Sequence, residues 1–167
     1  MNLIAAVSSE WGIGKDNKLL FNIPQDMKFF REMTMNKVVV MGRKTLESFP
    51  NQKPLPKRTN IVLSRNEDYA PEGVTVCHKP EELLKELKKY NSEDIFIIGG
   101  EQIYRIMIPF CDAAYITNVH ASREADSFLP DFTKLIDWEL EDRSPELSDN
   151  GYTFTFDLYR NKGVKPH

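Results

Sequence analysis

The chain of 167 residues has 41% hydrophobic content and a formal net charge of −3. This length gives one compact domain over residues 1–167 with a sizeable core, and it is too short for two ordinary domains. The slight negative charge gives no general attraction to polyanions, so nucleic acid and anionic membranes are not expected as partners. The sequence has no evident apolar surface stripe, and we therefore expect a monomer.

Cysteine and histidine usage bears on compartment and metal binding. The two cysteines, Cys77 and Cys111, lie far apart in the chain. This pattern fits buried thiols in a reducing compartment better than a disulfide scaffold. The three histidines form no ligand pattern, so no metal site is expected. The apolar start at residues 3–7 is too short for a signal peptide, and no run approaches membrane-spanning length. We expect a cytoplasmic protein.

Eight apolar, β-rich runs predict eight strands. They cover residues 3–7, 38–41, 60–63, 74–77, 95–98, 113–119, 138–141 and 152–159. Helical stretches fall between several of them, at residues 24–35, 44–48, 80–89 and 101–107. This alternation predicts parallel strands with helices packed on the sheet. The last run follows the turn signal Asn150-Gly151 and alternates apolar with polar residues, which predicts an antiparallel ribbon. The fold class is therefore α/β, with a mixed, mostly parallel eight-stranded sheet flanked by four helices.

The first helical stretch carries an acid in an unusual place. Pro24 suits the first turn of a helix that Asn22 or Ile23 precedes. At about 100° per residue, Asp26 lies in the middle of an apolar arc. This arc consists of Met27, Phe29, Phe30 and Met33. A carboxylate facing a core costs several kcal/mol unless something binds it. Alternatively, Asp26 is a helix-terminal carboxylate that favours the dipole and bonds a nearby amide. Spacing alone leaves both interpretations open.

Two segments have the order strand, glycine, helix start, which suits phosphate binding by free helix amides. In residues 95–104 the glycines are Gly99 and Gly100. They either let a ligand approach the backbone closely or only form a tight turn with positive φ. In residues 38–45, Arg43 and Lys44 flank the helix start.

A further strand ends in Ser64-Arg65. Arginines at two strand ends would form a dianion pocket of the kind that an adenosine 2′-phosphate needs. Taken singly, each arginine is more typical of a solvated surface charge.

Several short motifs follow one another over nearly the whole chain. They are Ile4-Ala5-Ala6, Gly14 with the loop to Leu19, Pro24-x-Asp26 with Phe30, Met41 to Thr45, Pro54-Leu55-Pro56, Arg58, Leu63-Ser64, Ile98-Gly99-Gly100, Tyr104, Thr117 and Asp126. Together they resemble dihydrofolate reductase of the bacterial type. The resemblance implies the same eight-stranded fold and the reduction of 7,8-dihydrofolate to 5,6,7,8-tetrahydrofolate by hydride transfer from NADPH. It also implies folate-like inhibitors as ligands.

The resemblance further implies a substrate pocket around Asp26. Asp26 would bind the pteridine amidine edge, with Thr117 behind it, and favour the protonated pterin electrostatically while the proton arrives through water. The walls would be Ile4, Ala5, Met27, Phe30, Phe49, Leu55 and Ile98. Arg58 would hold the glutamate carboxylate of the substrate.

A cofactor pocket is implied beside it. Ala6 and Ile13 would contact the nicotinamide carboxamide. The pyrophosphate would lie on Gly99, Gly100, Glu101, Gln102, Ile103 and Tyr104. The adenosine phosphate would be surrounded by Arg43, Lys44, Thr45, Ser64 and Arg65. Further cofactor contacts are implied for Gly14, Leu19, Gly42, Leu63 and Ile98. The Gly99–Gly100 peptide would be cis, and the loop from Ser8 to Leu20 would close over the nicotinamide, with Gly12 and Gly14 as flexible points.

The chain departs from the family pattern at three places. Leu20-Phe21 stands where Pro-Trp is usual, so the indole that commonly holds a water near the pterin is missing. Ala125 precedes Asp126 where glycine is frequent. Gln102 stands where some relatives place a cation.

Two other functions share this architecture. The pyrimidine reductase of riboflavin synthesis uses NADPH on a ribityl-phosphate type of substrate, and it would not need Asp26 together with Arg58. A catalytically silent regulator that binds NADPH or mRNA is the second alternative. Retention of a buried helix acid argues against this regulator, because folding does not require the acid.

Overall fold

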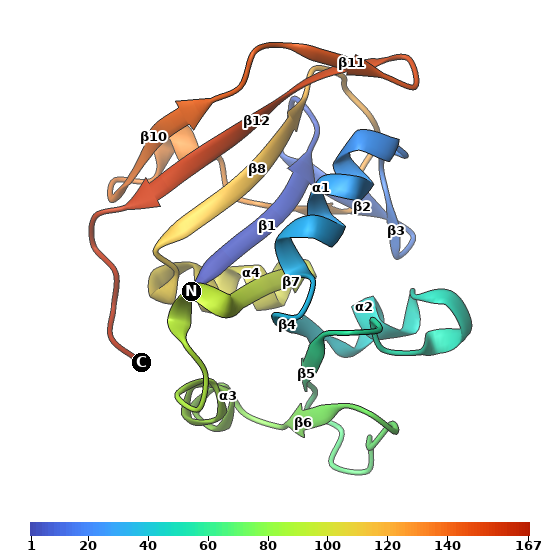
Figure 1. Ribbon diagram of the computed structural model, residues 1–167, viewed down its shortest axis with the longest axis vertical. Helices are drawn as coiled ribbons and strands as arrows, with labels where there is room; N and C mark the ends of the chain where they lie inside the picture. The colour runs from blue at the N-terminus through green and yellow to red at the C-terminus, as the bar shows by residue number, and fades with distance from the viewer.

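The computed structural model describes residues 1–167 and contains one large sheet and one small sheet. The large sheet is built from β1 (Asn2–Val7), β4 (Val38–Gly42), β5 (Thr59–Leu63), β6 (Thr75–Cys77), β7 (Ile95–Gly99), β8 (Ala113–Val119), β10 (Trp138–Arg143), β11 (Leu147–Asp149) and β12 (Tyr152–Asn161). Its strands follow the order β10-β12-β8-β1-β7-β4-β5-β6, and β11 pairs with β12 (Figure 1). All eight predicted strands are confirmed, with small shifts of their bounds.

Strand pairing confirms the mixed, mostly parallel sheet. β1 pairs in parallel with β7 and β8, while β4 pairs in parallel with β5 and β7. β6 continues the parallel part beside β5. These strands are continuous apolar runs because both faces of the sheet are covered; residues 38–41 and 95–97, for example, are all buried. β12 runs antiparallel to β8, β10 and β11, which confirms the predicted C-terminal ribbon.

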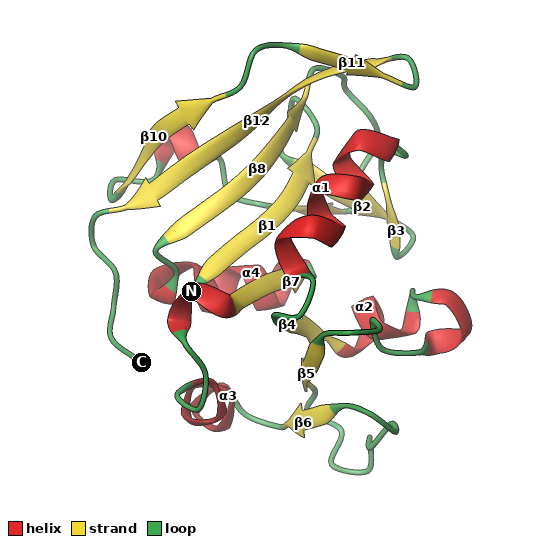
Figure 2. Ribbon diagram, in the orientation of Figure 1, coloured by secondary structure: helices red, strands yellow, loops and turns green.

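Four helices flank this sheet, as predicted. They are α1 (Pro24–Thr34), α2 (Arg43–Glu47), α3 (Pro80–Leu87) and α4 (Glu101–Met107), and four short 3-10 turns occur at Pro50–Gln52, Ser92–Asp94, Ile108–Phe110 and Phe132–Lys134. α4 packs on β7 and β4, α2 on β4 and β5, and α3 on β6 (Figure 2). On α1, the ring of Phe29 stacks on Phe156 of β12 with a centroid distance of 4.6 Å. No helix has the length and apolar character needed to cross a membrane.

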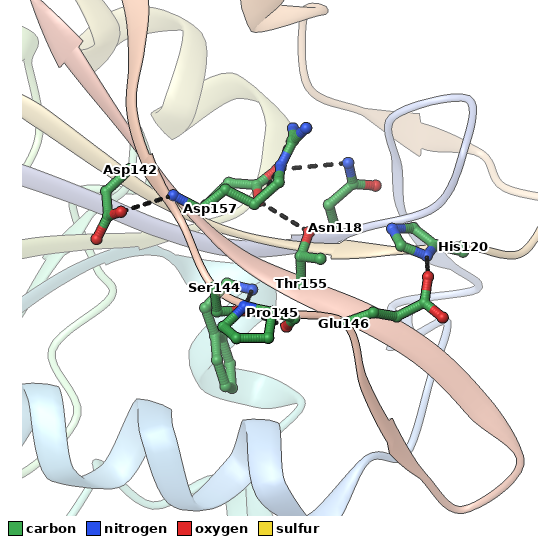
Figure 3. A network of polar contacts seen from close by, with 10 residues as sticks. Asn118, His120, Asp142, Ser144, Pro145, Glu146, Thr155 and Asp157 are labelled. Atoms are coloured by element: carbon green, nitrogen blue, oxygen red, sulfur yellow. Dashed lines mark hydrogen bonds and ion pairs between the residues drawn. The ribbon is translucent and has the colours of Figure 1, made fainter.

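The C-terminal ribbon is held by a tight turn and by an ion pair whose carboxylate is buried. Asn150 and Gly151 adopt φ values of 49° and 82°, the left-handed conformation that two-residue hairpins require. Asp157 is 3% exposed and accepts two bonds from the Arg143 guanidinium, at 2.8 and 2.9 Å. Thr155 Oγ1 donates to the same carboxylate at 2.8 Å (Figure 3). This network joins β10 to β12 beside an irregularity in their pairing.

The second sheet was not predicted from the sequence. It contains β2 (Gly12–Lys15), β3 (Lys18–Leu19) and β9 (Ser127–Phe128) in the order β3-β2-β9. The predicted loop from Ser8 to Leu20 is therefore largely a hairpin that pairs with a distant segment.

Candidate functional site

The glycines of the two predicted phosphate segments meet at one edge of the large sheet. Gly42 at the end of β4 pairs with Leu63 at the end of β5, and Met41 pairs with Gly99 at the end of β7. Since these strands are parallel, their carboxyl ends share this edge, where α/β sheets bind ligands. A Cβ on Gly42 would lie 3.2 Å from Ile103, so the backbones pack closely there.

Asp26 is held at the same edge by a residue from another strand. Thr117 Oγ1 of β8 donates to Asp26 Oδ1 at 2.6 Å. Thr117 is 2% exposed and pairs with Ala6 on β1 and Phe156 on β12. Burial raises the pKa of the Asp26 carboxyl above 3.8, while the Thr117 hydrogen bond opposes this shift. Asp26 lies in the first turn of α1, where its charge favours the helix dipole, but its carboxylate accepts its hydrogen bond from Thr117 and not from a backbone amide of the helix.

The apolar residues predicted to line the substrate pocket lie in different parts of the core. Phe49, Leu55 and Ile98 pack against a small buried cluster beneath α2. Ile4 of β1 is 5% exposed, and its carbonyl accepts a 2.7 Å bond from the Tyr104 hydroxyl. Along α1, Phe30 is half-buried.

One member of the predicted apolar arc does not face a core. Met27 is 56% exposed, so its side chain does not pack in the protein interior. The polar side of the helix is as expected, since Gln25, Lys28, Arg31 and Glu32 are all exposed. Ala5, half-buried on β1, packs against the main core.

Arg58 lies near the carboxyl end of α1. Its Nε donates to Thr34 Oγ1 at 3.2 Å, and Nη1 donates to the Pro56 carbonyl at 2.9 Å. Partial burial and the nearby Arg31 guanidinium lower the pKa of Arg58. Sequence reasoning missed Thr34, although it follows Phe30 at the four-residue interval that marks one helix face. Two guanidinium groups thus gather at this end of the helix.

The Gly99–Gly100 peptide is cis, as the family resemblance implied. Gly99 has a φ of 128°, whereas Gly100, which precedes α4, has a φ of −84°. The tight-turn interpretation therefore accounts for only one of the two glycines. A Cβ on Gly100 would lie 3.7 Å from Thr45 Oγ1, which brings the start of α4 beside α2.

Cations gather where β4 and β5 end. Arg43 and Lys44 are exposed at the start of α2, and Arg43 Nη1 lies 3.8 Å from Glu47 Oε2. Arg65 is exposed beyond β5, next to the buried Ser64. These residues follow the paired strands β4 and β5, so the structure brings the predicted basic groups to neighbouring positions.

His78 was missed by sequence reasoning. It follows β6, and its Nδ1 donates to the Ser64 carbonyl at 2.8 Å. This contact places an imidazole beside the strand end that carries Arg65. The only sequence signal was the position of His78 after a predicted strand.

The glycines of the β2–β3 hairpin are tightly packed. A Cβ on Gly12 would lie 2.7 Å from the Ala125 Cβ, and one on Gly14 would lie 2.9 Å from Ser127 Oγ. Each of these two glycines allows close approach to the segment around β9. Ala125, where relatives often have glycine, is thus part of this contact.

Hydrogen bonds of side chains connect the β2–β3 hairpin and β9 to the neighbouring helices. Asp126 Oδ2 accepts the Asp16 amide at 2.9 Å, and Asn17 Nδ2 donates to the Lys44 carbonyl at 2.9 Å. Glu101 Oε1 accepts the Phe128 amide at 2.6 Å, which joins α4 to β9. Sequence reasoning missed Asn17.

The remaining predicted cofactor residues vary in exposure. Leu19 is 79% exposed, and Gln102 is also exposed. Ile13 packs partly against the main core. Phe21, where relatives often have tryptophan, lies edge-on to Tyr152 with a centroid distance of 5.0 Å.

These features define an α/β protein with a candidate ligand site at the carboxyl ends of its parallel strands, where a half-buried acid and a cationic group occupy separate parts. The family model for dihydrofolate reductase matches residues 1–161. The chain belongs to the dihydrofolate reductase family.

Individual relatives agree with this assignment. The dihydrofolate reductase of Neisseria gonorrhoeae is 38% identical over 162 residues, which cover 97% of this chain and 98% of the relative. A solved structure of dihydrofolate reductase from Enterococcus faecalis, complexed with NADP(H) and RAB-propyl, has a TM-score of 0.86 and 37% identity, covering 96% of this chain and 95% of that one. The bifunctional dihydrofolate reductase-thymidylate synthase of Glycine max is 37% identical over 92% of this chain, but the match spans only 32% of that protein.

Proposed function

We propose that this chain reduces 7,8-dihydrofolate to 5,6,7,8-tetrahydrofolate with NADPH. The observation that carries this proposal is the Asp26 carboxylate, which is half-buried on α1 and accepts a 2.6 Å hydrogen bond from Thr117. Folding alone does not call for a desolvated acid in this position. An acid fixed in this way can bind the amidine edge of a pterin and stabilise positive charge on the ring.

In the substrate half, Asp26 orients the pterin and favours its protonated form, and the proton arrives through water. Apolar walls exclude bulk water, which strengthens this electrostatic effect. We assign these walls to Ile4, Ala5, Met27, Phe30, Phe49, Leu55 and Ile98. Arg58 would bind the glutamate carboxylate, since a guanidinium group matches a carboxylate bidentately. The pyrimidine reductase alternative does not require Asp26 and Arg58 together.

In the cofactor half, the residues present fit a dinucleotide phosphate. Gly42 lets α4 pack closely on the end of β4, and the start of α4 offers backbone amides. When bound, NADPH would supply the hydride. Ala6, Ile13, Gly14 and Leu19 would bind the nicotinamide end, and Ile98 to Tyr104 the pyrophosphate. The adenosine phosphate would contact Gly42 to Thr45 and Leu63 to Arg65.

We also propose that the chain works as a single domain and a monomer in the cytoplasm, with folate-like inhibitors binding the substrate half. The two cysteines are buried and unpaired, which suits a reducing compartment. The thymidylate synthase part of the bifunctional relatives lies outside the matched segment and is not proposed for this chain.

The test is loss of reduced-nicotinamide absorbance when protein, NADPH and dihydrofolate are mixed. Rapid loss with dihydrofolate, and none without it, supports the proposal. No loss from properly folded protein that still binds NADPH would instead favour the silent regulator.

A further inference from the structure

The start of α1 lacks a cap from its own residues. Ile23, which precedes the helix, makes no side-chain hydrogen bond to the first turn, and Pro24 has no amide hydrogen. The backbone amides of Asp26 and Met27 both donate to the Ile23 carbonyl at 3.0 Å. The Gln25 amide therefore needs an acceptor from outside the helix.

The hairpin between β11 and β12 supplies that acceptor. Asp149 Oδ2 accepts the Gln25 amide at 2.8 Å. Asn150 Nδ2 donates to the Asn22 carbonyl at 2.6 Å, and Gln25 Nε2 donates to the Ser148 carbonyl at 3.3 Å. A carboxylate in this position also interacts favourably with the helix dipole. The hairpin thus caps α1 although Asp149 and Gln25 are separated by 124 positions in the sequence.

Apolar packing keeps the hairpin on the start of the helix. Ile23 is 1% exposed and shares a small buried cluster with Val119 of β8 and Phe154 of β12. Leu147 of β11 and Tyr152 of β12 pack against the same cluster. The cap is therefore part of a packed unit and not an isolated surface hydrogen bond.

The strand that continues from this hairpin also supports the partner of Asp26. Phe156 of β12 pairs with Thr117 of β8, and the Thr117 hydroxyl donates to Asp26. Asp26 directly follows Gln25, whose amide is bound by Asp149. Thr117 and the start of α1, which lie on either side of Asp26, are thus both attached to the β11–β12 hairpin.

We propose that Asp149 is a positioning residue for dihydrofolate reduction, because by capping α1 it holds Asp26 against Thr117. Asp149 acts through the helix and not by contact with the substrate. This inference rests on the proposed function, since the role it assigns is exerted through Asp26.

The first test compares D149A with D149N. Loss of the acceptor in D149A should lower kcat for dihydrofolate by roughly tenfold, because small displacements of a catalytic group reduce rates strongly, while the affinity for NADPH should not change. D149N keeps an acceptor oxygen and should retain more than half of kcat. D142A, which removes an exposed carboxylate on β10, is the matched control and should turn over normally. If D149A does not fold, D149E replaces it, because its longer side chain displaces the acceptor.

A double-mutant cycle separates positioning from general stability. In the D26N background, D149A should lower the residual turnover by no more than about twofold, because residues that act through one group are not additive. The inference would be overturned if D149A lowered turnover as strongly in the D26N background as in the unaltered protein. Normal turnover in D149A alone would also overturn it. Absence of turnover in the unaltered protein would overturn the proposed function and this inference with it.

Discussion

Replacing Asp26 with Asn tests the charge at the centre of the site. The amide keeps the size of the side chain and an oxygen that can accept the Thr117 hydroxyl, which lies 2.6 Å from the carboxylate. The negative charge is lost, and one acceptor oxygen becomes an NH2 donor. A large loss of turnover that acid partly restores therefore reports electrostatic stabilisation of the protonating pterin.

The size of the effect follows from Coulomb's law. At the effective dielectric constant of a partly buried site, two unit charges about 4 Å apart attract by about 4 kcal/mol. Since about 1.4 kcal/mol corresponds to a tenfold change in rate, turnover of dihydrofolate should fall by about three orders of magnitude at neutral pH. Acid should partly restore the variant, because solvent then protonates the pterin without help from a carboxylate.

The thermal stability of the Asp26→Asn protein should not fall with its turnover. Burial raises the pKa of Asp26, so the ionised carboxylate is disfavoured in the folded protein. The stabilisation that Asp26 provides is complete below its unfolded-state pKa and is lost as pH rises through the higher folded-state pKa. At neutral pH, Asp26→Asn should therefore melt at the same temperature as the unaltered protein or higher. At a pH below the pKa of Asp26, this advantage should disappear.

The assay is turnover across pH together with thermal melting of both proteins. Asp142→Asn, which removes an exposed carboxylate of β10, controls for net charge. A fully active Asp26→Asn protein would refute the electrostatic role. An inactive variant that also unfolds at neutral pH would show that Asp26 serves the fold.

Three further outcomes are expected from other parts of the site. R43A combined with R65A should erase most of the preference for NADPH over NADH, because charge-assisted phosphate contacts are lost; equal affinities in the unaltered protein would contradict this pocket. R58A should raise KM for dihydrofolate at least about tenfold, the cost of about one charged hydrogen bond, with NADPH titrations unchanged; weakening of NADPH binding alone would place Arg58 in the cofactor half. Gly12→Ala should lower the free energy of unfolding by about 1–3 kcal/mol, since its Cβ would lie 2.7 Å from that of Ala125. Adding Ala125→Gly should recover part of this loss in denaturant melts, and strict additivity would refute the contact.

Hydrophobic patterning predicted the main sheet because its strands are apolar runs covered on both faces, as β4 and β7 are. The strands β2, β3, β9 and β11 have only two to four residues each, and their composition is polar or glycine-containing. β3 and β11 belong to local hairpins with β2 and β12, whereas β9 forms because a distant segment pairs with it, as Phe128 does with Gly12. Local periodicity carries no information about such pairs.

In the site, too, local signals could be predicted from the sequence and contacts between distant segments could not. Asp26 was predicted because an acid interrupts an apolar arc, which is a local signal. Its partner Thr117 is 91 positions away and was reached only through the family resemblance. Thr34 and Asp149 went unnoticed because their roles depend on which segments the fold brings against α1. The close packing of Gly12 also went unnoticed, because it depends on Ala125, which only the fold brings next to it.

The most direct test of hydride transfer in this cleft uses NADPH labelled with deuterium at both positions of the nicotinamide C4. The protein is mixed with labelled cofactor and dihydrofolate, and the folate product is analysed by mass spectrometry. If the chain catalyses the proposed reaction, the tetrahydrofolate carries one deuterium from the cofactor. Oxidation of the cofactor without deuterium in tetrahydrofolate, or no tetrahydrofolate from folded protein, would contradict the assignment.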